Sequence, residues 1–320
     1  YQEEAARGLQ AEEDVFSPGY FKWPSTAGTS VIVTLAADEA PQGNLHALFE
    51  QAVADARHPW QKQKTGFETP LAQALLGASE SFSVRDEDKS RYLLAGYHWF
   101  GPWGRDTFIA LPGLTLVTGR FEEAKALLST LARHVTEGLV PNLVDEGGGA
   151  AYNTVDASLW YIWAGQKYLD YTGDVEFATK ELWPVLQGIL ASYETGTRYG
   201  IHADSDGLIT AGDEGTQLTW MDAKYGDWVV TPRAGKAVEI NALWYNALRF
   251  GEKLAVLAGE SGDHYGKLAS RVFESFNQSF WYPEGGYLLD VIGPAGVDAS
   301  FRPNQIIAAS LPFPVLDKPR

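Results

Sequence analysis

The sequence predicts a mainly α-helical domain, and three observations support this prediction. From residue 44 onward, apolar residues repeat at the three- and four-residue spacing of amphipathic helices. These segments follow one another with short glycine joints and without regular strands between them. The start of the chain differs, because it is rich in Pro, Gly, Thr and Val and lacks a long helical repeat. We therefore expect a helical domain over residues 41–320, preceded over residues 1–40 by the tail of a β-rich domain.

The expected elements follow from this patterning. A β-type run predicts a strand over residues 29–35. The clearest helix is predicted over residues 120–137, with Gly138 as its left-handed cap. Pro184 marks a kink or restart within a later helix, and Ser261 is expected to cap the last one. The further helices are predicted over residues 154–171, 174–199, 238–258 and 261–281.

Composition excludes several classes of function. The net charge of -16 argues against binding to a nucleic-acid backbone, which requires a basic surface. The sequence has no apolar run long enough to span a membrane and no signal sequence at its start, and we expect a cytoplasmic protein. It has no cysteine, and its 6 histidines are scattered without metal-binding spacing. We therefore expect no metal and no other cofactor.

Carboxylates and aromatic residues are concentrated between residues 212 and 246. Asp222 is a lone acid beside Trp220 and Met221, and such neighbours would desolvate it, as a general acid near neutral pH requires. Aromatic ring faces can hold the C–H surface of a sugar. This combination predicts a carbohydrate-cleaving site. The alternative is a solvated loop whose aromatic residues only pack.

The arrangement of helices and loops leaves three architectures open: a bundle, a solenoid or a closed ring of helix pairs. No period of 20 to 50 residues repeats, which weighs against a solenoid. Three loops rich in polar and aromatic residues fall between predicted helices, as if they shared one end of a barrel. They contain HWFGPWGRD, LVDEGGGAAYNTVDASLWY and the stretch of residues 212–246.

Four segments of the sequence carry a family resemblance: residues 96–114 (GYHWFGPWGRDTFIALPGL), 152–161 (YNTVDASLWY), 219–248 (TWMDAKYGDWVVTPRAGKAVEINALWYNAL) and 302–312 (RPNQIIAASLP). They resemble the C-terminal amylo-α-1,6-glucosidase domain of archaeal and bacterial glycogen debranching enzymes. The resemblance implies an (α/α)6 barrel related to glucoamylase. The general base of that family lies further along than Arg320, so we expect the last helices and the base to be missing.

The resemblance also implies roles for individual residues. Asp222, in TWMDA, corresponds to the general acid. Arg105 and Asp106, in WGRD, are expected to hold hydroxyl groups of the terminal glucose, because a guanidinium donates and a carboxylate accepts. The alternative for this pair is a structural salt bridge. Other residues are expected to line the pocket or stack on the sugar, with packing as the alternative for each: Trp99, Trp103, Asp156, Trp160, Trp220, Glu239 and Asn241.

The activity implied is inverting hydrolysis of α-1,6-linked glucose at branch points of glycogen or limit dextrin, with release of glucose. Three alternatives stay open. The first is another inverting (α/α)6 glycosidase, such as a trehalase or a glucoamylase. The second is a glucan-binding module without catalysis, and the third is a helical scaffold whose aromatic residues all belong to the core. The oligomeric state is not predicted.

Overall fold

The structure is a computed structural model that describes most of the chain. The described residues are 41–62, 69–85, 90–96, 100–144, 149–212 and 215–317 and, before these, 2, 5, 12, 17, 19–24 and 26–34. The chain divides into two units, residues 1–56 and 57–320, which we describe separately.

In the first unit, a helix follows an irregular segment. Helix α2 (Leu45–Lys62) begins in this unit, where the Asn44 side chain accepts hydrogen bonds from the backbone N–H groups of His46 and Ala47 at 3.0 and 3.3 Å. Residues 29–34 form no strand, so the predicted strand is wrong over these residues; Leu35 lies outside the described part. A strand requires a hydrogen-bonded neighbour, and no described segment pairs with this one. That residues 1–40 end a β domain stays a prediction.

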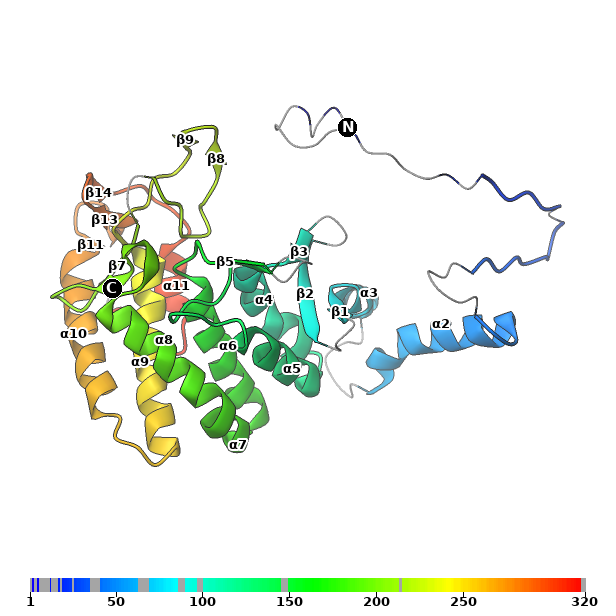
Figure 1. Cartoon of the computed structure of the whole chain (residues 1–320), viewed down its shortest axis with the longest axis horizontal. Coiled ribbons are helices and arrows are strands. Elements are labelled where there is room, and N and C mark those ends of the chain that lie inside the picture. Colours follow the sequence, from blue (N-terminus) through cyan, green and yellow to red (C-terminus); the bar gives the residue numbers. More distant parts are fainter. Residues whose placement is uncertain are drawn as a thin grey trace. The chain divides into compact units, whose positions relative to one another are not determined.

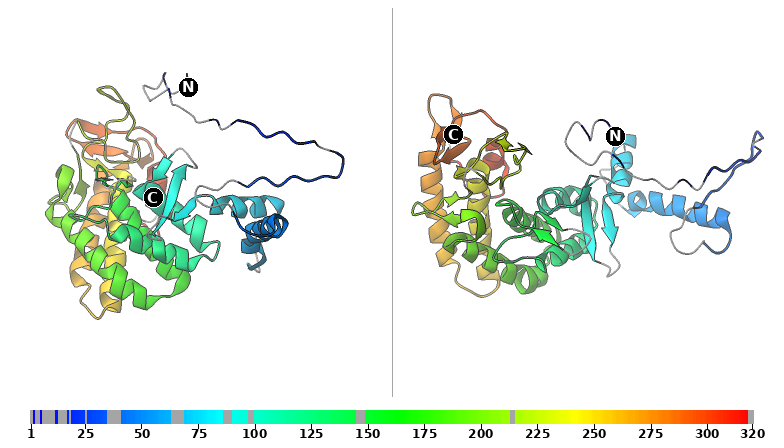
Figure 2. Two further views of the ribbon diagram at one scale, coloured as in Figure 1. Left: turned by 45° about the vertical axis from the view of Figure 1, so that its right-hand side comes forward. Right: turned by 45° about the horizontal axis from the view of Figure 1, so that its top comes forward.

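The second unit consists mainly of helices packed in two layers (Figures 1 and 2). Neighbouring helices of the first layer contact one another in chain order. Each helix of the second layer packs on a helix of the first. The first layer contains α4 (Gly104–Leu111), α6 (Ala157–Thr172), α9 (Val238–Leu257) and α11 (Gln305–Ser310); the second contains α5 (Phe121–Ala132), α8 (Trp183–Thr195) and α10 (Asp263–Ser279).

The residues of each helix explain its layer. Helix α9 buries side chains around most of its circumference, among them Ile240, Trp244 and Leu248. A helix that is apolar on all sides must be covered on all sides, as α9 is by its neighbours. Helix α10 instead buries a single stripe that includes Leu268 and Val272. Its polar face can therefore remain in water.

The predicted helices are confirmed, but several of their ends differ from the prediction, among them the start of α6 at Ala157 instead of residue 154 and the end of α8 at Thr195 instead of residue 199. Helix α5 ends at Ala132, five residues earlier than expected. Thr136 and Leu139 instead exchange both backbone hydrogen bonds around a two-residue turn, in which Glu137 and Gly138 have φ values of 51° and 75°. Gly138 therefore serves a tight turn rather than a helix cap. Helix α10 begins at Asp263, whose N–H donates to the Ser261 hydroxyl at 3.3 Å.

The restart predicted at Pro184 is also confirmed. Helix α7 (Val175–Phe177) continues into the π-helical turn η2 (Ala178–Leu182), and α8 follows with Pro184 in its first turn. Proline has no N–H to donate and its ring crowds the preceding turn. The wider π turn accommodates this change within one continuous helical segment.

Small antiparallel sheets, which the periodicity did not predict, connect the helices. Their strands are two to six residues long, too short to show a two-residue alternation. The three-stranded sheets are β1 (Ser83–Arg85), β2 (Arg91–Gly96) and β3 (Phe100–Pro102), and β10 (Lys236–Ala237), β13 (Val291–Gly293) and β14 (Gly296–Asp298). The hairpins are β4 (Leu143–Val144) with β5 (Ala150–Ala151), β6 (His202–Ala203) with β7 (Ile209–Thr210), β8 (Lys224–Tyr225) with β9 (Trp228–Val229), and β11 (Trp281–Tyr282) with β12 (Tyr287–Leu288). The remaining helical segments are α3 (Pro70–Glu80), η1 (Pro112–Leu116) and η3 (Arg198–Gly200).

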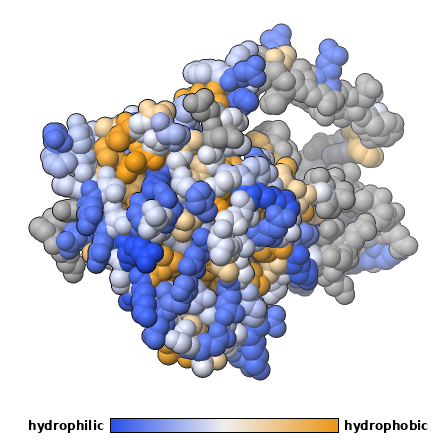
Figure 3. Space-filling model, turned by 60° about the vertical axis from the view of Figure 1, so that its left-hand side comes forward, coloured by the Kyte–Doolittle hydropathy of each residue, from blue (hydrophilic) through white to orange (hydrophobic). Residues whose placement is uncertain are grey.

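The second unit is thus a layered array of helix pairs. A closed ring of six pairs is not seen in the described residues, and the (α/α)6 barrel stays a prediction. No described helix has the length and apolar character needed to cross a membrane. The face shown in Figure 3 is mostly hydrophilic, with hydrophobic residues gathered near its upper left.

Candidate active site

The candidate site begins where two first-layer helices start. Arg105 lies in the first turn of α4, and Asp156 immediately precedes α6. The Nε of Arg105 donates to both carboxylate oxygens of Asp156 at 2.8 Å. The Thr154 hydroxyl also donates to Asp156 at 2.7 Å. It accepts from the N–H of Ala157 and so caps α6, which the Asp156 side chain does not. This buried pair joins the two helix starts.

Gly104 allows α4 to begin so close to its neighbours. Its N–H donates to the carbonyl of Asn142 at 2.9 Å. A Cβ at this position would lie 2.1 Å from the carbonyl oxygen of Pro141, which is closer than any real contact. Any other residue would therefore push Arg105 away from Asp156. The glycine of the WGRD segment thus has a packing reason.

Asp222 reaches the same place from a distant part of the sequence. The N–H of Val155 donates to the carbonyl of Leu218 at 2.9 Å, which ties the segment before Asp222 to the start of α6. Nη1 of Arg105 then donates to Oδ2 of Asp222 at 3.2 Å. The Asp222 side chain keeps 37% of its surface exposed, whereas that of Asp156 keeps 1%. The desolvation expected for Asp222 is therefore not seen.

Burial and neighbouring charges shift the pKa values of Arg105 and Asp106. Burial alone would lower the pKa of Arg105, but Asp156 and Asp222 raise it above its ordinary value. Asp106 is exposed, yet the protein around it partly desolvates its carboxyl and raises its pKa, with Arg105 opposing and the other two acids adding to the rise. Within the described residues, Nη2 of Arg105 is buried without a hydrogen-bond partner.

A second polar cluster supports the segment that carries Asp222. The indole N–H of Trp220 donates to Oδ1 of Asn304 at 2.8 Å, and the Asn304 amide contacts the sulfur of Met221 at 3.4 Å. The same amide donates to Asp290 at 2.7 Å. Asn304 is 1% exposed and Asp290 is 2% exposed. The two residues before Asp222, Trp220 and Met221, are therefore anchored to the interior.

Glu239 and Asn241 were expected to line the pocket, but the structure places both in the interior with protein partners. Arg233 donates to both oxygens of Glu239, the second bond being 2.7 Å long, and also to Asp290. Asn241 donates to the carbonyls of Ile209 and Ala237 and accepts from the N–H of Ile209 at 2.6 Å. These are the contacts of packing residues.

The tryptophans expected at the site lie in different surroundings. Trp220 is 46% exposed beside Asp222. Trp160 is half-buried in α6, where its ring meets Trp163 edge to face at 5.2 Å. Trp103 directly precedes α4 and forms an isolated antiparallel β-bridge with Leu143. Trp99 lies outside the described residues. Trp220 is thus the tryptophan that the described structure places next to Asp222.

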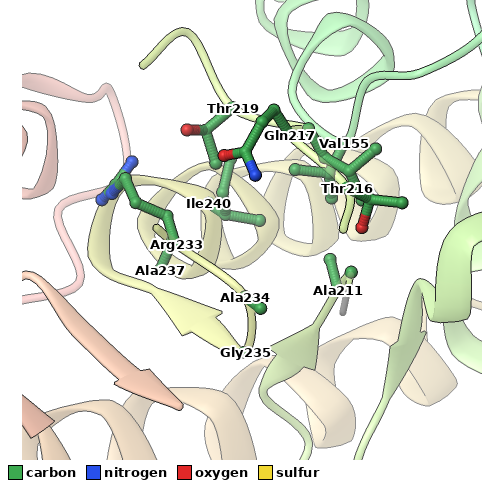
Figure 4. A pocket seen from close by; sticks show the side chains of 12 residues that line it. Val155, Ala211, Thr216, Gln217, Thr219, Arg233, Ala234, Gly235, Ala237 and Ile240 are labelled. Atoms are coloured by element: carbon green, nitrogen blue, oxygen red, sulfur yellow. The ribbon is translucent and has the colours of Figure 1, made fainter. Parts of the chain in front are cut away.

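Two cavities lie near this segment. The smaller one has a volume of about 10 Å³, with Ala211 and Gly235 on one side and Gln217 and Thr219 on the other (Figure 4). It could hold about one water molecule. The larger one, about 400 Å³, lies between Arg233 and the β13–β14 hairpin. Asp222 lines neither of them. In the part of the chain that is described, no group of acidic residues and histidines is arranged to hold a metal ion.

Comparison with known proteins places these residues in a family. A family model described as amylo-alpha-1,6-glucosidase matches residues 77–320. The chain belongs to this family. The amylo-alpha-1,6-glucosidase family consists of glycoside hydrolases, and the matched region includes Arg105, Asp156 and Asp222. The glycogen debranching enzyme of Saccharomyces cerevisiae is 33% identical over 202 residues, and the match covers 46% of this chain. This chain spans only 13% of the yeast protein.

Solved structures show a related fold. A GH78 rhamnosidase of a Bacillus species has a TM-score of 0.51 and 21% identity, covering 64% of this chain and 20% of that one. An uncharacterized conserved protein from Thermus thermophilus has a TM-score of 0.55 and 16% identity, covering 77% of this chain and 73% of that one. At these identities the likeness concerns the fold alone. It agrees with the helical architecture of this amylo-alpha-1,6-glucosidase family member.

Sequence reasoning did not identify the supporting residues of the site. Asn304 lies in the RPNQ segment that carried the family resemblance, but its contact with Trp220 spans 84 positions and leaves no periodic trace. Asp290 was missed for the same reason, because it pairs with Arg233 57 positions away, whereas Thr154 contacts Asp156 only two positions away and was overlooked although its contact is local. The resemblance could have drawn attention to Thr154 and Asn304, which lie in its segments, but not to Asp290, which lies outside them.

Proposed function

We propose that this domain hydrolyses α-1,6-linked glucose at branch points of glycogen-like α-glucan, with Asp222 as the general acid. The observation that carries this proposal is the shared guanidinium of Arg105. It links Asp222 to the buried Asp156 where α4 and α6 begin, in a chain of the amylo-alpha-1,6-glucosidase family. Asp222 is the partly exposed member of the pair, so a substrate can reach it.

In this proposal the acid and the residues around it have separate tasks. Asp222 protonates the glycosidic oxygen as the bond to glucose breaks. Its hydrogen bond to Arg105 uses Oδ2, and Oδ1 accepts none from the described residues. Glucosyl hydroxyls would replace Asp222 as partners of Arg105 and would also satisfy the buried Nη2. Asp106 would accept from neighbouring hydroxyls.

We further propose that the reaction inverts the anomeric carbon. A water molecule would attack from the face opposite Asp222, activated by a second carboxylate about 6.5–9.5 Å from the first. Proton transfer by side chains suffices for this chemistry, so no metal or organic cofactor is needed. The substrate would be glycogen or a limit dextrin, and the product would be β-glucose.

Proton NMR of product formation tests the proposal. In a protein that includes the general base, a glucan with single α-1,6-linked glucose branches should release β-glucose first, followed by mutarotation. Asp222→Asn should lower kcat by about 10²- to 10⁴-fold, because the amide cannot supply the proton. Glu284→Gln, which removes an exposed carboxylate from the turn between β11 and β12, is the control. Equal turnover by Asp222→Asn and the unaltered protein would exclude Asp222 as the acid.

A further inference from the structure

The β8–β9 hairpin, which follows Asp222 directly, exposes an aromatic pair. Tyr225 and Trp228 are 68% and 64% exposed and lie opposite each other across the two strands. Residues paired in this way project from the same face of a hairpin. Val230, whose N–H donates to the carbonyl of Ala223, continues that face and is 45% exposed. Leaving such side chains in water forgoes the free energy of their burial.

The position of the hairpin relative to Asp222 suggests what covers it. Tyr225 lies three positions after Asp222, so its Cα lies within about 11 Å of that of the acid, and Trp228 lies opposite Tyr225 in the hairpin. A general acid contacts the leaving oxygen of its substrate. The part of the glucan that departs from glucose must therefore lie on the Asp222 side. We propose that Tyr225 and Trp228 bind the main chain of a branched α-glucan, on the leaving-group side of the bond; this rests on the proposed function.

The chemistry of the hairpin fits a glucan. Ring faces pack on the C–H surfaces of glucose units. Asp227, exposed in the turn of the same hairpin, offers an acceptor for hydroxyl groups. A protein partner would need a far larger surface, since a stable interface takes about 20–30 residues from each side. The exposed part of this hairpin spans residues 223–230.

Binding measured by titration calorimetry tests the inference directly. Linear maltoheptaose represents the main chain, and glucose represents the group released. Trp228→Ala should raise the Kd for maltoheptaose at least tenfold and leave that for glucose unchanged. Trp228→Phe keeps a ring and should restore most of the affinity. Tyr171→Ala is a matched control, because Tyr171 is 50% exposed at the far end of α6, about 22 Å from Asp156.

Kinetics separate this inference from the proposed function. With a long branched substrate, Trp228→Ala should raise KM at least tenfold, whereas KM for isomaltose should not change. If the unaltered protein hydrolyses both substrates and Trp228→Ala alters neither KM nor the maltoheptaose Kd, the inference fails and the function stands. If the hairpin binds maltoheptaose but a protein that includes the general base releases no glucose, the function fails and the binding surface stands. The inference is overturned if the unaltered protein does not bind maltoheptaose. It is also overturned if Trp228→Ala changes self-association of the protein and not its binding of glucan.

Discussion

At the scale of single residues, Arg105 is the centre of the site. One guanidinium serves the buried Asp156 through Nε and the exposed Asp222 through Nη1. Lysine could not replace it, because an ammonium group cannot donate in two fixed directions from one plane. The same residue therefore holds two helix starts together and contacts the proposed acid until a substrate takes its place.

Removing Arg105 should destabilise the fold as well as abolish activity. Arg105→Ala leaves Asp156 buried with Thr154 as its main partner, and we expect the free energy of unfolding to fall by about 3–5 kcal/mol in urea denaturation. Asp156→Asn in the same background should then cost much less than it does alone. Additive effects of the two substitutions would contradict a direct interaction.

At the scale of elements, ion pairs join the β13–β14 hairpin to the segment before α11. Arg302 donates to Asp290 and Asp298 at 2.6 and 2.5 Å, and Asp290 also accepts from Arg233 and Asn304. This cluster supports Trp220 through Asn304. Its parts come from four segments of the sequence that only folding brings together.

Asp298 should contribute to stability in a pH-dependent way. Partial burial opposes its ionisation, but hydrogen bonds from Arg302 and Ser300 lower the pKa of Asp298 to about 2. Its contribution is complete above the pKa of the unfolded chain, near 4, and is lost as pH falls towards 2. Asp298→Asn should therefore lower stability at pH 6 and show a shallower loss between about pH 4 and 2. Urea denaturation at several pH values measures this.

The control for that experiment is Asp227→Asn, which removes one exposed carboxylate from the β8–β9 turn. It should change stability at pH 6 by less than about 0.5 kcal/mol. A pH dependence of Asp298→Asn parallel to that of the unaltered protein would show that the Arg302 contact does not stabilise the fold.

At the scale of the whole molecule, buried amides join helices of both layers to the end of the described chain. Asn246 of α9 donates to Gln166 of α6 at 2.8 Å and accepts from the N–H of Phe313 at 3.1 Å. Asn277 of α10 likewise donates to the carbonyl of Val315 and accepts from the N–H of Asp317. The segment after α11 is therefore part of the folded core.

Asn246→Leu tests this connection. The substitution keeps the branched shape of the side chain but leaves the Gln166 amide and the Phe313 N–H buried without their partner, so we expect a loss of about 2–4 kcal/mol in the free energy of unfolding. Asn246→Asp, which retains an acceptor for Phe313, is the comparison, and protease susceptibility near residue 313 reports local release. Unchanged stability and protection would show that the segment is held by other contacts.

The helices could be predicted because their information is local. Apolar spacing identified α5, α6, α8, α9 and α10, and Pro184 fixed the restart before α8. The end of α5 could not be read this way, because the Glu137–Gly138 turn depends on pairing between Thr136 and Leu139. Strands of two or three residues carry too little pattern to be seen.

The sequence by itself determined the helical character, the acidic net charge and, through its motifs, the family. Only the tertiary structure decided which acids meet, because Arg105, Asp156 and Asp222 are up to 117 positions apart. It also decided that Glu239 and Asn241 are buried partners of other residues and that Asp222 is partly exposed. Periodicity reports which side of an element faces the core, whereas contacts between loops depend on how whole elements pack, and no local pattern encodes that.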